Sequence, residues 1–359
     1  MKMQMPFFNM ANFNPNVNSV KCPFKCIMTR NNINGINNPS FINSALQSFA
    51  CIKCINLWIN NLYQHAYQIN SNQNMQLTKE IFKLFSSLYN GQIPDSSNFI
   101  YQYLNKHYII NQQDPYHFLF YLIQLLHDEN NRPMNLNYDA TVLNRQSIEN
   151  RRNKTYMRNL FAQFLQQSQN SIFSKNFFNI LGNKFSCDNC QDTFNDSYRY
   201  IIKFPLDEYR NYRNMVFPYK TNTNITLDDC FVCYTGENIK QCLACGNFNY
   251  KTYTSFFSPA NILIIALIRK NHSFKCDIDF PIKFNINNYL EIGRNINKYY
   301  ILKACVSLNN QGIYFSDICM NNYWFRFYLQ NFILLGNAFN DIQYIHQFEP
   351  QLLFYEIEG

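Results

Sequence analysis

The chain has 359 residues, of which 47% are hydrophobic and 17% aromatic, and its formal net charge is +8. This apolar content suffices for a sizeable core and excludes a globally disordered chain, while the length fits one large domain or two ordinary ones. The basic residues are dispersed rather than clustered, so we expect no nucleic-acid partner.

The sequence has no apolar run of 18 residues and no signal-peptide pattern at its start. We therefore expect no membrane span and an intracellular location, either cytoplasmic or nuclear. A mitochondrial location stays open, because no acidic residue precedes Glu80 and transit peptides are poor in acidic residues. Residues 1–31 are rich in Asn, Met and Phe without a period and are predicted to form an N-terminal arm.

A polar loop containing Gly35 and Pro39 leads into a segment whose apolar residues recur with helical spacing. A buried helix is therefore predicted to begin near Ser40. The first N–H groups of a helix are free and its dipole is positive there, so a nucleophile at this place would have a lowered pKa. Ser40 occupies that place.

The thirteen cysteines, in a chain without secretion signals, favour free thiols or metal ligation over disulfides. Cys51 and Cys54 are predicted to share one face of the helix that begins near Ser40. Together with Cys22 and Cys26 they offer the four thiols of a zinc site. We favour the interpretation that these four are small buried hydrophobic residues.

Further along the chain, residues 78–89 have a helical period, and Asp114 is a natural N-cap for another apolar helix. Residues 130–155 are polar and are predicted to be a surface insertion. Residues 200–206 have the pattern of a strand, and residues 259–270 are rich in β-branched side chains, which is typical of a central buried strand.

Two Cys-x-x-Cys pairs follow, Cys187 with Cys190 and Cys242 with Cys245. Two intervening residues allow one turn to present two thiolates to a tetrahedral zinc ion. The sequence therefore predicts that these four cysteines bind one structural Zn²⁺ ion, which links two segments that lie far apart in the chain. The alternative is a set of buried thiols without metal.

Several segments resemble the sequence boxes of the ubiquitin-specific proteases, a family of ubiquitin carboxyl-terminal hydrolases. Residues 38–47 are similar to the first catalytic box, in which a Cys stands where this chain has Ser40. Residues 112–129 are similar to the second box, with His117 where the family usually has Glu. The segments that resemble later boxes are residues 259–270, 280–284, 300–308, 312–314 and 324–329.

The resemblance implies an α+β fold of the papain-like, ubiquitin-specific-protease type, in one domain over residues 32–357. A helical thumb is expected at about residues 32–160, packed on a mixed palm sheet. Zinc-clipped fingers are expected at about residues 165–255, because the family carries a pair of cysteine knuckles there.

The resemblance also places the catalytic positions. The nucleophilic Cys of the family falls on Ser40, its general-base His on Ile313, and the residue that orients this His on Tyr328. A Cys protease needs a thiolate, a base within hydrogen-bond reach and a group that holds the base. Because Ile313 accepts no proton, we predict a pseudoenzyme, and we expect Ile313 and Tyr328 to close the cleft near Ser40.

Three functions follow from these predictions. The favoured one is a non-catalytic scaffold subunit whose partners are other protein subunits of a larger assembly. The alternative is a module that binds ubiquitin, or a ubiquitin-like protein, without cleaving it. An active ubiquitin thiolesterase is the least favoured. The sequence does not name the assembly.

Overall fold

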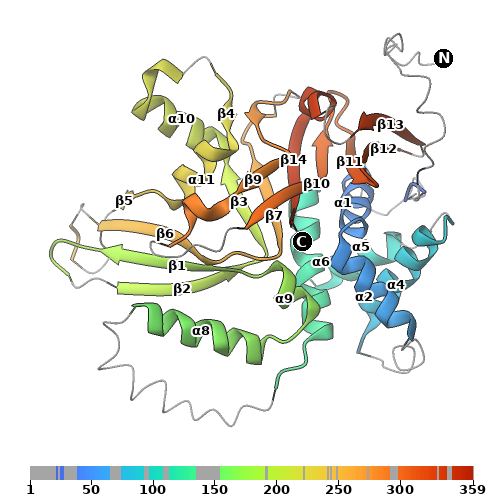
Figure 1. The fold of residues 1–359 in the computed structure, drawn as a ribbon, viewed down its shortest axis with the longest axis horizontal. Coiled ribbons are helices and arrows are strands. Elements are labelled where there is room, and N and C mark those ends of the chain that lie inside the picture. Colours follow the sequence, from blue (N-terminus) through green and yellow to red (C-terminus); the bar gives the residue numbers. More distant parts are fainter. Residues whose placement is uncertain are drawn as a thin grey trace.

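The computed structural model describes most of the chain, which Figure 1 draws as coloured ribbon. The described residues are 22, 25–27, 39–64, 74–92, 97–107, 113–134, 154–190, 193–220, 223–240, 242, 245–247, 250–272, 275–291, 298–329, 331–337 and 342–358. Within these ranges, no helix has both the length and the apolar character needed to cross a bilayer.

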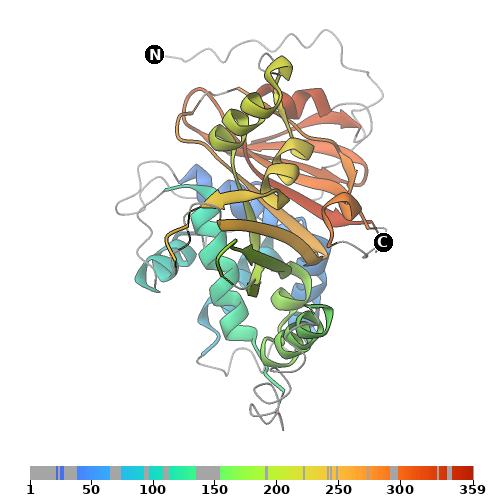
Figure 2. The ribbon, with the colours of Figure 1, turned by 90° about the vertical axis from the view of Figure 1, so that its left-hand side faces the viewer.

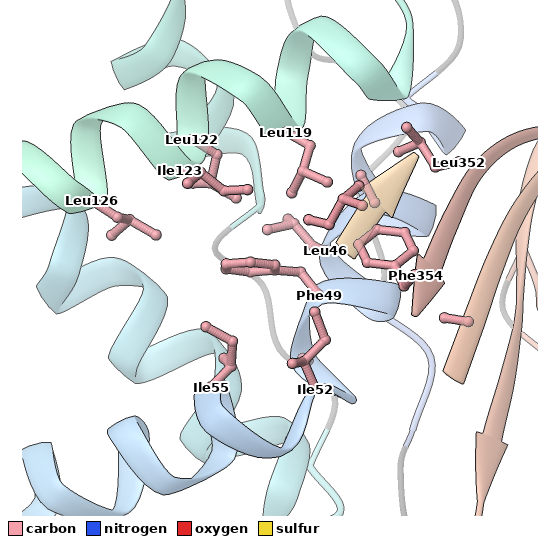
Figure 3. Close-up of a cluster of buried hydrophobic side chains, with 14 of the residues drawn as sticks. Leu46, Phe49, Ile52, Ile55, Leu119, Leu122, Ile123, Leu126, Leu352 and Phe354 are labelled. Carbon is pink, nitrogen blue, oxygen red and sulfur yellow. The ribbon is translucent and has the colours of Figure 1, made fainter. Parts of the chain in front are cut away.

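A group of helices forms the predicted thumb. Their bounds are α1 (Ser40–Ala50), α2 (Lys53–Gln64), α4 (Gln76–Tyr89), α5 (Ser97–His107) and α6 (Pro115–Asn130). As predicted, Asp114 caps α6, since its side chain accepts a hydrogen bond from the His117 N–H at 2.9 Å. The apolar stripes of α1 and α6 face each other around Phe49, as Figure 3 shows.

The single helix expected from Ser40 through Cys54 is in fact two helices. α1 ends at Ala50, and α2 begins at Lys53. Ile52 lies between them, 1% exposed, and its carbonyl starts the hydrogen bonding of α2 by accepting from the Ile55 and Asn56 N–H groups. Because no Gly or Pro occurs at this break, the sequence pattern predicted one continuous helix.

The palm is an eight-stranded sheet in which β13, β12, β11, β10, β14, β7 and β3 lie side by side and β9 pairs with β10. The strands are β3 (Ile201–Pro205), β7 (Ile262–Ile268), β9 (Lys283–Asn285), β10 (Tyr299–Leu308), β11 (Tyr314–Met320), β12 (Tyr323–Tyr328), β13 (Asn331–Asn337) and β14 (Glu349–Ile357). Strand β7 is buried on both faces, as its apolar run predicted, but it lies second from the β3 edge rather than at the centre of the sheet. Its alternate residues enter two separate cores, with Ile264 on the thumb side and Ile265 on the other.

The fingers are a four-stranded sheet in the order β2, β1, β6, β5. The strands are β1 (Asn179–Ser186), β2 (Thr193–Arg199), β5 (Asn238–Lys240) and β6 (Tyr250–Ser258). Helix α8 (Lys154–Ser168) lies along β2, where Arg158 pairs with Asp196 at 2.9 Å, and α9 (Ile172–Phe177) connects it to β1. Leu165 of α8 also lies in the thumb-side core, so this helix spans the predicted thumb boundary near residue 160.

The segment from residue 201 to residue 235 also differs from the prediction, which assigned it to the fingers. β3 joins the palm sheet, and the elements after it cover the palm face opposite the thumb (Figure 2). These elements are α10 (Leu206–Val216), η3 (Pro218–Lys220), β4 (Ile225–Thr226) and α11 (Leu227–Thr235), with β8 (Ile278–Asp279), η4 (Ile286–Tyr289) and η5 (Ile342–Gln347) on the same side. The fingers are thus built from two separate stretches of chain.

Part of the predicted N-terminal arm is docked on the thumb. Gln47 of α1, which is 2% exposed, accepts a hydrogen bond from the Ile27 N–H at 2.9 Å and donates to the Lys25 carbonyl at 3.2 Å. Cys26 and Ile27 are buried in the thumb core. The side-chain amide of Gln47 therefore binds this short piece of main chain through both its oxygen and its nitrogen.

Candidate functional site

The helix start at Ser40 is embedded in the thumb core. Phe41 is 1% exposed, and its ring makes edge contacts with Tyr101, Phe118 and Tyr314 at centroid distances of 6.1, 6.1 and 6.5 Å. Ring pairs of this kind add to the stability that burial alone provides. The start of α1 is thus fixed against both α6 and the palm strand β11.

Ser40 lies at the junction of thumb and palm, as the resemblance implies for the nucleophile. Its side-chain oxygen accepts a hydrogen bond from the Tyr314 N–H at 2.9 Å, and the residue is 8% exposed. Tyr314 directly follows Ile313, so the two positions that the resemblance assigned to nucleophile and base do meet in space. The contact that joins these two segments comes from the Tyr314 main-chain amide.

A turn organised by Asn309 carries Ile313. The Asn309 side-chain oxygen accepts hydrogen bonds from the N–H groups of Gln311 and Ile313 at 3.0 and 2.9 Å, and its main-chain N–H donates to the Ile313 carbonyl at 3.1 Å. Gly312 has a φ of 73°, which a glycine adopts without strain. Asn309 therefore fixes the conformation of the loop between β10 and β11.

Tyr328, the third position, is bound to the same turn. Its hydroxyl accepts a hydrogen bond from the Asn309 side-chain amide at 3.3 Å and donates to the Gln311 side-chain oxygen at 3.2 Å. The loop before Ser40 lies outside the described residues, so the closure of the cleft stays a prediction. Asn309 was not predicted from the sequence, although an Asn followed three residues later by Gly is a turn signal.

Two histidine–carboxylate pairs flank this region. Nδ1 of His117 lies 2.6 Å from Asp114, and Nδ1 of His272 lies 2.5 Å from Glu349, a fully buried carboxylate. Burial, together with the charges of Asp114 and Glu349, raises the pKa of Tyr314. Both carboxylates therefore act electrostatically on the strand residue that binds Ser40.

His346, the histidine that follows the last box, lies elsewhere. Its ring packs on Phe280 with a centroid distance of 4.3 Å, and burial lowers its pKa. Phe280 belongs to the core on the palm face opposite the thumb, whereas Phe41 beside Ser40 belongs to the thumb-side core.

The four predicted ligand cysteines come together at the end of the fingers. The sulfur atoms of Cys187, Cys190, Cys242 and Cys245 all lie within 4.8 Å of one another, with Cys187–Cys245 at 3.5 Å and Cys190–Cys242 at 4.0 Å. With Zn–S bonds of about 2.3 Å, the sulfur atoms of a tetrahedral site lie about 3.8 Å apart. The donor set and its spacing are compatible with a zinc-binding finger.

Each cysteine pair is part of a tight turn. The Cys190 N–H donates to the Cys187 carbonyl at 3.2 Å, and the Gly246 N–H donates to the Cys242 carbonyl at 2.8 Å. Gly246 has a φ of 73° directly after Cys245. These turns point both thiols of a pair to one side, as a knuckle requires.

The other four candidate zinc ligands do not form a comparable cluster. They are Cys22, Cys26, Cys51 and Cys54. Among the described residues, the fingers cluster is the one set of three or more His, Cys, Asp or Glu side chains that the geometry brings within reach of one ion. Burial and the neighbouring Cys22 raise the pKa of Cys26 to about 12, whereas Cys51 has Glu356 and Cys319 as its neighbours. The interpretation as separate, partly or fully buried thiols is therefore the better one.

Thumb, palm and cysteine-clustered fingers together define a papain-like α+β protein with the architecture of the ubiquitin-specific proteases. A family model described as ubiquitin carboxyl-terminal hydrolase matches residues 32–355. The chain therefore belongs to the ubiquitin carboxyl-terminal hydrolase family, a family of deubiquitinating enzymes.

Solved structures of this fold are similar to the chain over nearly its whole length. One is described as the Ubp8-Sgf11-Sgf73-Sus1 SAGA DUB module, with a TM-score of 0.61, 17% identity and coverage of 94% of this chain and 68% of the other. Another is the SAGA Ubp8/Sgf11/Sus1/Sgf73 DUB module bound to ubiquitin aldehyde, with values of 0.62, 16%, 94% and 70%.

A third is a yeast SAGA DUB module with a mutant Sgf73, for which the TM-score is 0.61, the identity 17% and the coverage 98% and 74%. At these identities the likeness shows the fold alone. No curated protein matches the chain.

Proposed function

We propose that this protein is a catalytically inactive member of its family that serves as a structural subunit of a larger intracellular protein assembly. The observation that carries the proposal is the hydrogen bond from the Tyr314 N–H to the Ser40 side-chain oxygen. A hydroxyl that accepts from a main-chain amide joins thumb to palm and adds to stability. The amide is not a base and takes no proton from the hydroxyl.

The three positions aligned with the catalytic triad support the same conclusion. A serine hydroxyl is far less acidic than a thiol and depends on a base for nucleophilic attack. Ile313, aligned with that base, carries no proton acceptor, and the Tyr328 hydroxyl is engaged by Asn309 and Gln311. We take Ser40, Ile313 and Tyr328 as the degenerate catalytic positions.

The cysteine cluster is proposed to hold one structural zinc ion. Zinc bound by four thiolates cross-links the segments that contribute them and contributes folding energy. In this chain the ion would tie the end of β1 to the segment between β5 and β6, through Cys187, Cys190, Cys242 and Cys245. The fingers sheet would then be closed at its outer end.

A second candidate function is the binding of ubiquitin or a ubiquitin-like protein without cleavage. The specific observation in its favour is the pair of carboxylates, Asp114 and Glu349, whose charges reach Tyr314 beside Ser40. One of the similar structures is described as bound to ubiquitin aldehyde, and such binding comes to this chain only as a proposal.

The test of inactivity uses a fluorogenic ubiquitin substrate and a ubiquitin vinyl-sulfone-type probe with the full-length chain. We expect no turnover above a heat-denatured control and no covalent adduct. Ile313→His alone should also remain inactive, since neither nucleophile nor orienting group returns. Turnover that disappears in Ser40→Ala would overturn the proposal.

The test of the structural role is purification of the native protein under gentle conditions. We expect it to co-purify with its neighbours in fixed stoichiometry. Binding of monoubiquitin by the isolated chain, together with a native protein that purifies alone, would favour the ubiquitin-binding alternative.

A further inference from the structure

The two edges of the palm sheet differ in how they are protected. An edge strand exposes unpaired N–H and C=O groups and is a template for another strand unless it is covered, charged or interrupted by proline. β3 forms one edge and carries Lys203 and Pro205. Phe204 of β3 packs on Tyr209 of α10 and Phe231 of α11, which cover one face of the sheet beside this strand. The β3 edge thus carries a charge and a proline, and both disfavour an additional strand.

β13 forms the other edge and, among the residues that the structure describes, has none of these features. Within the described part of the chain it pairs with β12 alone, at the outer end of the sheet (Figure 1). No Lys, Arg, Asp, Glu or Pro occurs between Arg326 and Asp341. Phe332 and Ile333 are 39% and 48% exposed, and Leu329 at the preceding turn is 56% exposed.

Contacts of Arg326 stabilise the β12–β13 hairpin that forms this edge. Arg326 of β12 donates two hydrogen bonds to the buried Asp317 carboxylate, at 2.7 and 2.9 Å. Its guanidinium also lies over the rings of Phe315 and Phe348, at 4.6 Å from each centroid. A pre-organised edge loses little conformational freedom when it binds another segment.

The register sets the length of the available template. Residues 331–334 of β13 pair regularly with β12, and the pairing then skips Leu335 before it resumes at Gly336, whose φ is 145°. Such a bulge twists the strand and interrupts a regular edge. An added strand therefore has about four residues of regular main chain to bind.

We infer that β13 is a docking site for a short extended segment of a partner subunit, which adds to the palm as a further strand. This inference rests on the proposed role as an assembly subunit and identifies a surface for it. The segment should be uncharged and apolar at alternate positions, because a charged side chain would face Phe332 or Ile333 without a counter-charge. Four regular residues are too short for two copies of this chain to form a large interface edge to edge.

The experiment selects from a displayed library of random eight-residue peptides on the full-length chain. We expect enriched peptides without charged residues and with apolar residues at every second position. A synthetic consensus peptide should bind the wild-type chain and lose at least tenfold in affinity for Ile333→Lys. The matched control is Met215→Lys, at a residue of α10 that is 79% exposed, and it should bind the peptide unchanged.

Backbone N-methylation tests strand addition directly. Two versions of the consensus peptide carry N-methyl groups on alternate amides, one set on odd positions and the other on even positions. Strand addition uses one set only, so one version should bind and the other should not. Equal binding by both would overturn the inference, as would a charged consensus or an equal loss with Met215→Lys.

Two further outcomes are decisive. Folding of Ile333→Lys is checked by circular dichroism and melting temperature, and Phe332→Lys serves as the second variant. If the wild-type chain alone is a dimer that Ile333→Lys dissolves, the occupant is a second copy and the partner-segment inference is wrong. Ubiquitin turnover would overturn the proposed inactivity only, whereas an inert chain without peptide binding would overturn this inference only.

Discussion

The family resemblance implies specific chemistry at two places, the cysteine cluster of the fingers and the start of α1. The two places differ in whether the residues that the resemblance implies are present. The fingers keep all four thiols within 4.8 Å of one another. At the start of α1, the aligned positions hold Ser40 and Ile313, and the Ser40 hydroxyl binds the Tyr314 amide. On the proposed assignment of Ser40 and Ile313 to the catalytic positions, groups that hold the fold together and groups that perform a reaction change independently.

Loss of a cysteine ligand should have the largest effect. Elemental analysis of the wild-type protein should find about one zinc per chain. Cys187→Ser should lose the metal and unfold the fingers, because structural zinc contributes apparent binding energies of about 10–16 kcal/mol in small zinc-finger peptides. Hydrogen exchange of β1 and β6 measures this loss.

The control for the zinc site is Cys233→Ser, which changes a half-buried thiol of α11 outside the cluster. It should keep the zinc and the hydrogen-exchange pattern. A wild-type protein that is free of metal and tolerates Cys187→Ser would remove the contrast between the two regions.

The core beneath Ser40 should rank second. Phe41→Ala removes a ring that touches three other aromatic rings and should cost about 3–5 kcal/mol of unfolding free energy in denaturant titrations. Phe164→Ala, at an α8 residue that is 43% exposed, should change it by less than about 0.5 kcal/mol. Equal effects would show that the thumb–palm junction is not tightly packed.

The ion pairs of Asp277 with Arg269 and Arg210, which include no residue of either region, give a reference for acid sensitivity. Burial alone would raise the pKa of Asp277, but the guanidiniums of Arg269 and Arg210 outweigh it and hold that pKa below its usual value. The stabilisation is therefore present above the unfolded pKa of about 4 and disappears as the pH falls through the folded value. Asp277→Asn should cost about 1.5–3 kcal/mol at pH 7 and progressively less below pH 4.

Thermal melts from pH 7 to pH 3 measure this difference. Glu208→Gln, at a carboxylate that is 60% exposed and 3.4 Å from Lys270, serves as the control and should leave the melting curves unchanged. A difference between wild type and Asp277→Asn that persists unchanged at pH 3 would contradict the assigned direction of the pKa shift.

The smallest effect is expected at Ser40 itself. Ser40→Ala removes the acceptor of the Tyr314 N–H and should cost about 1–2 kcal/mol of unfolding free energy. Ser40→Thr keeps the hydroxyl and should recover part of that stability. Ubiquitin turnover should stay at background in all three proteins, and a loss of turnover without a loss of stability would assign Ser40 to catalysis instead.

The sequence predicted well those features that leave a local pattern. The apolar periods located α4 and α6, the β-branched run located β7, and the Cys-x-x-Cys spacing identified the two halves of the cysteine cluster. Each of these patterns is set by burial on a regular element or by the reach of a turn, and both are properties of a few neighbouring residues.

Other features depend on contacts between distant residues and escaped prediction. The break at Ile52 is stabilised by burial in the thumb core, and α8 is located by the pair of Arg158 with Asp196. The turn of Asn309 had a local signal that the prediction did not use, whereas the contact of Asn309 with Tyr328, on another strand, had none. The role of Ser40 likewise depends on an amide that follows it by 274 positions in the sequence.

The hydrogen bonds of Gln47 to Lys25 and Ile27 limit how far this protein can be shortened from its N-terminus without losing native contacts. A shortened chain that begins at residue 32, where the family match begins, would leave both polar atoms of a 2%-exposed amide without their main-chain partners. It would also uncover the core surface beneath Ile27. Trimming before residue 22 spares these contacts, so the packed core of the protein includes residues that lie upstream of the recognisable family domain.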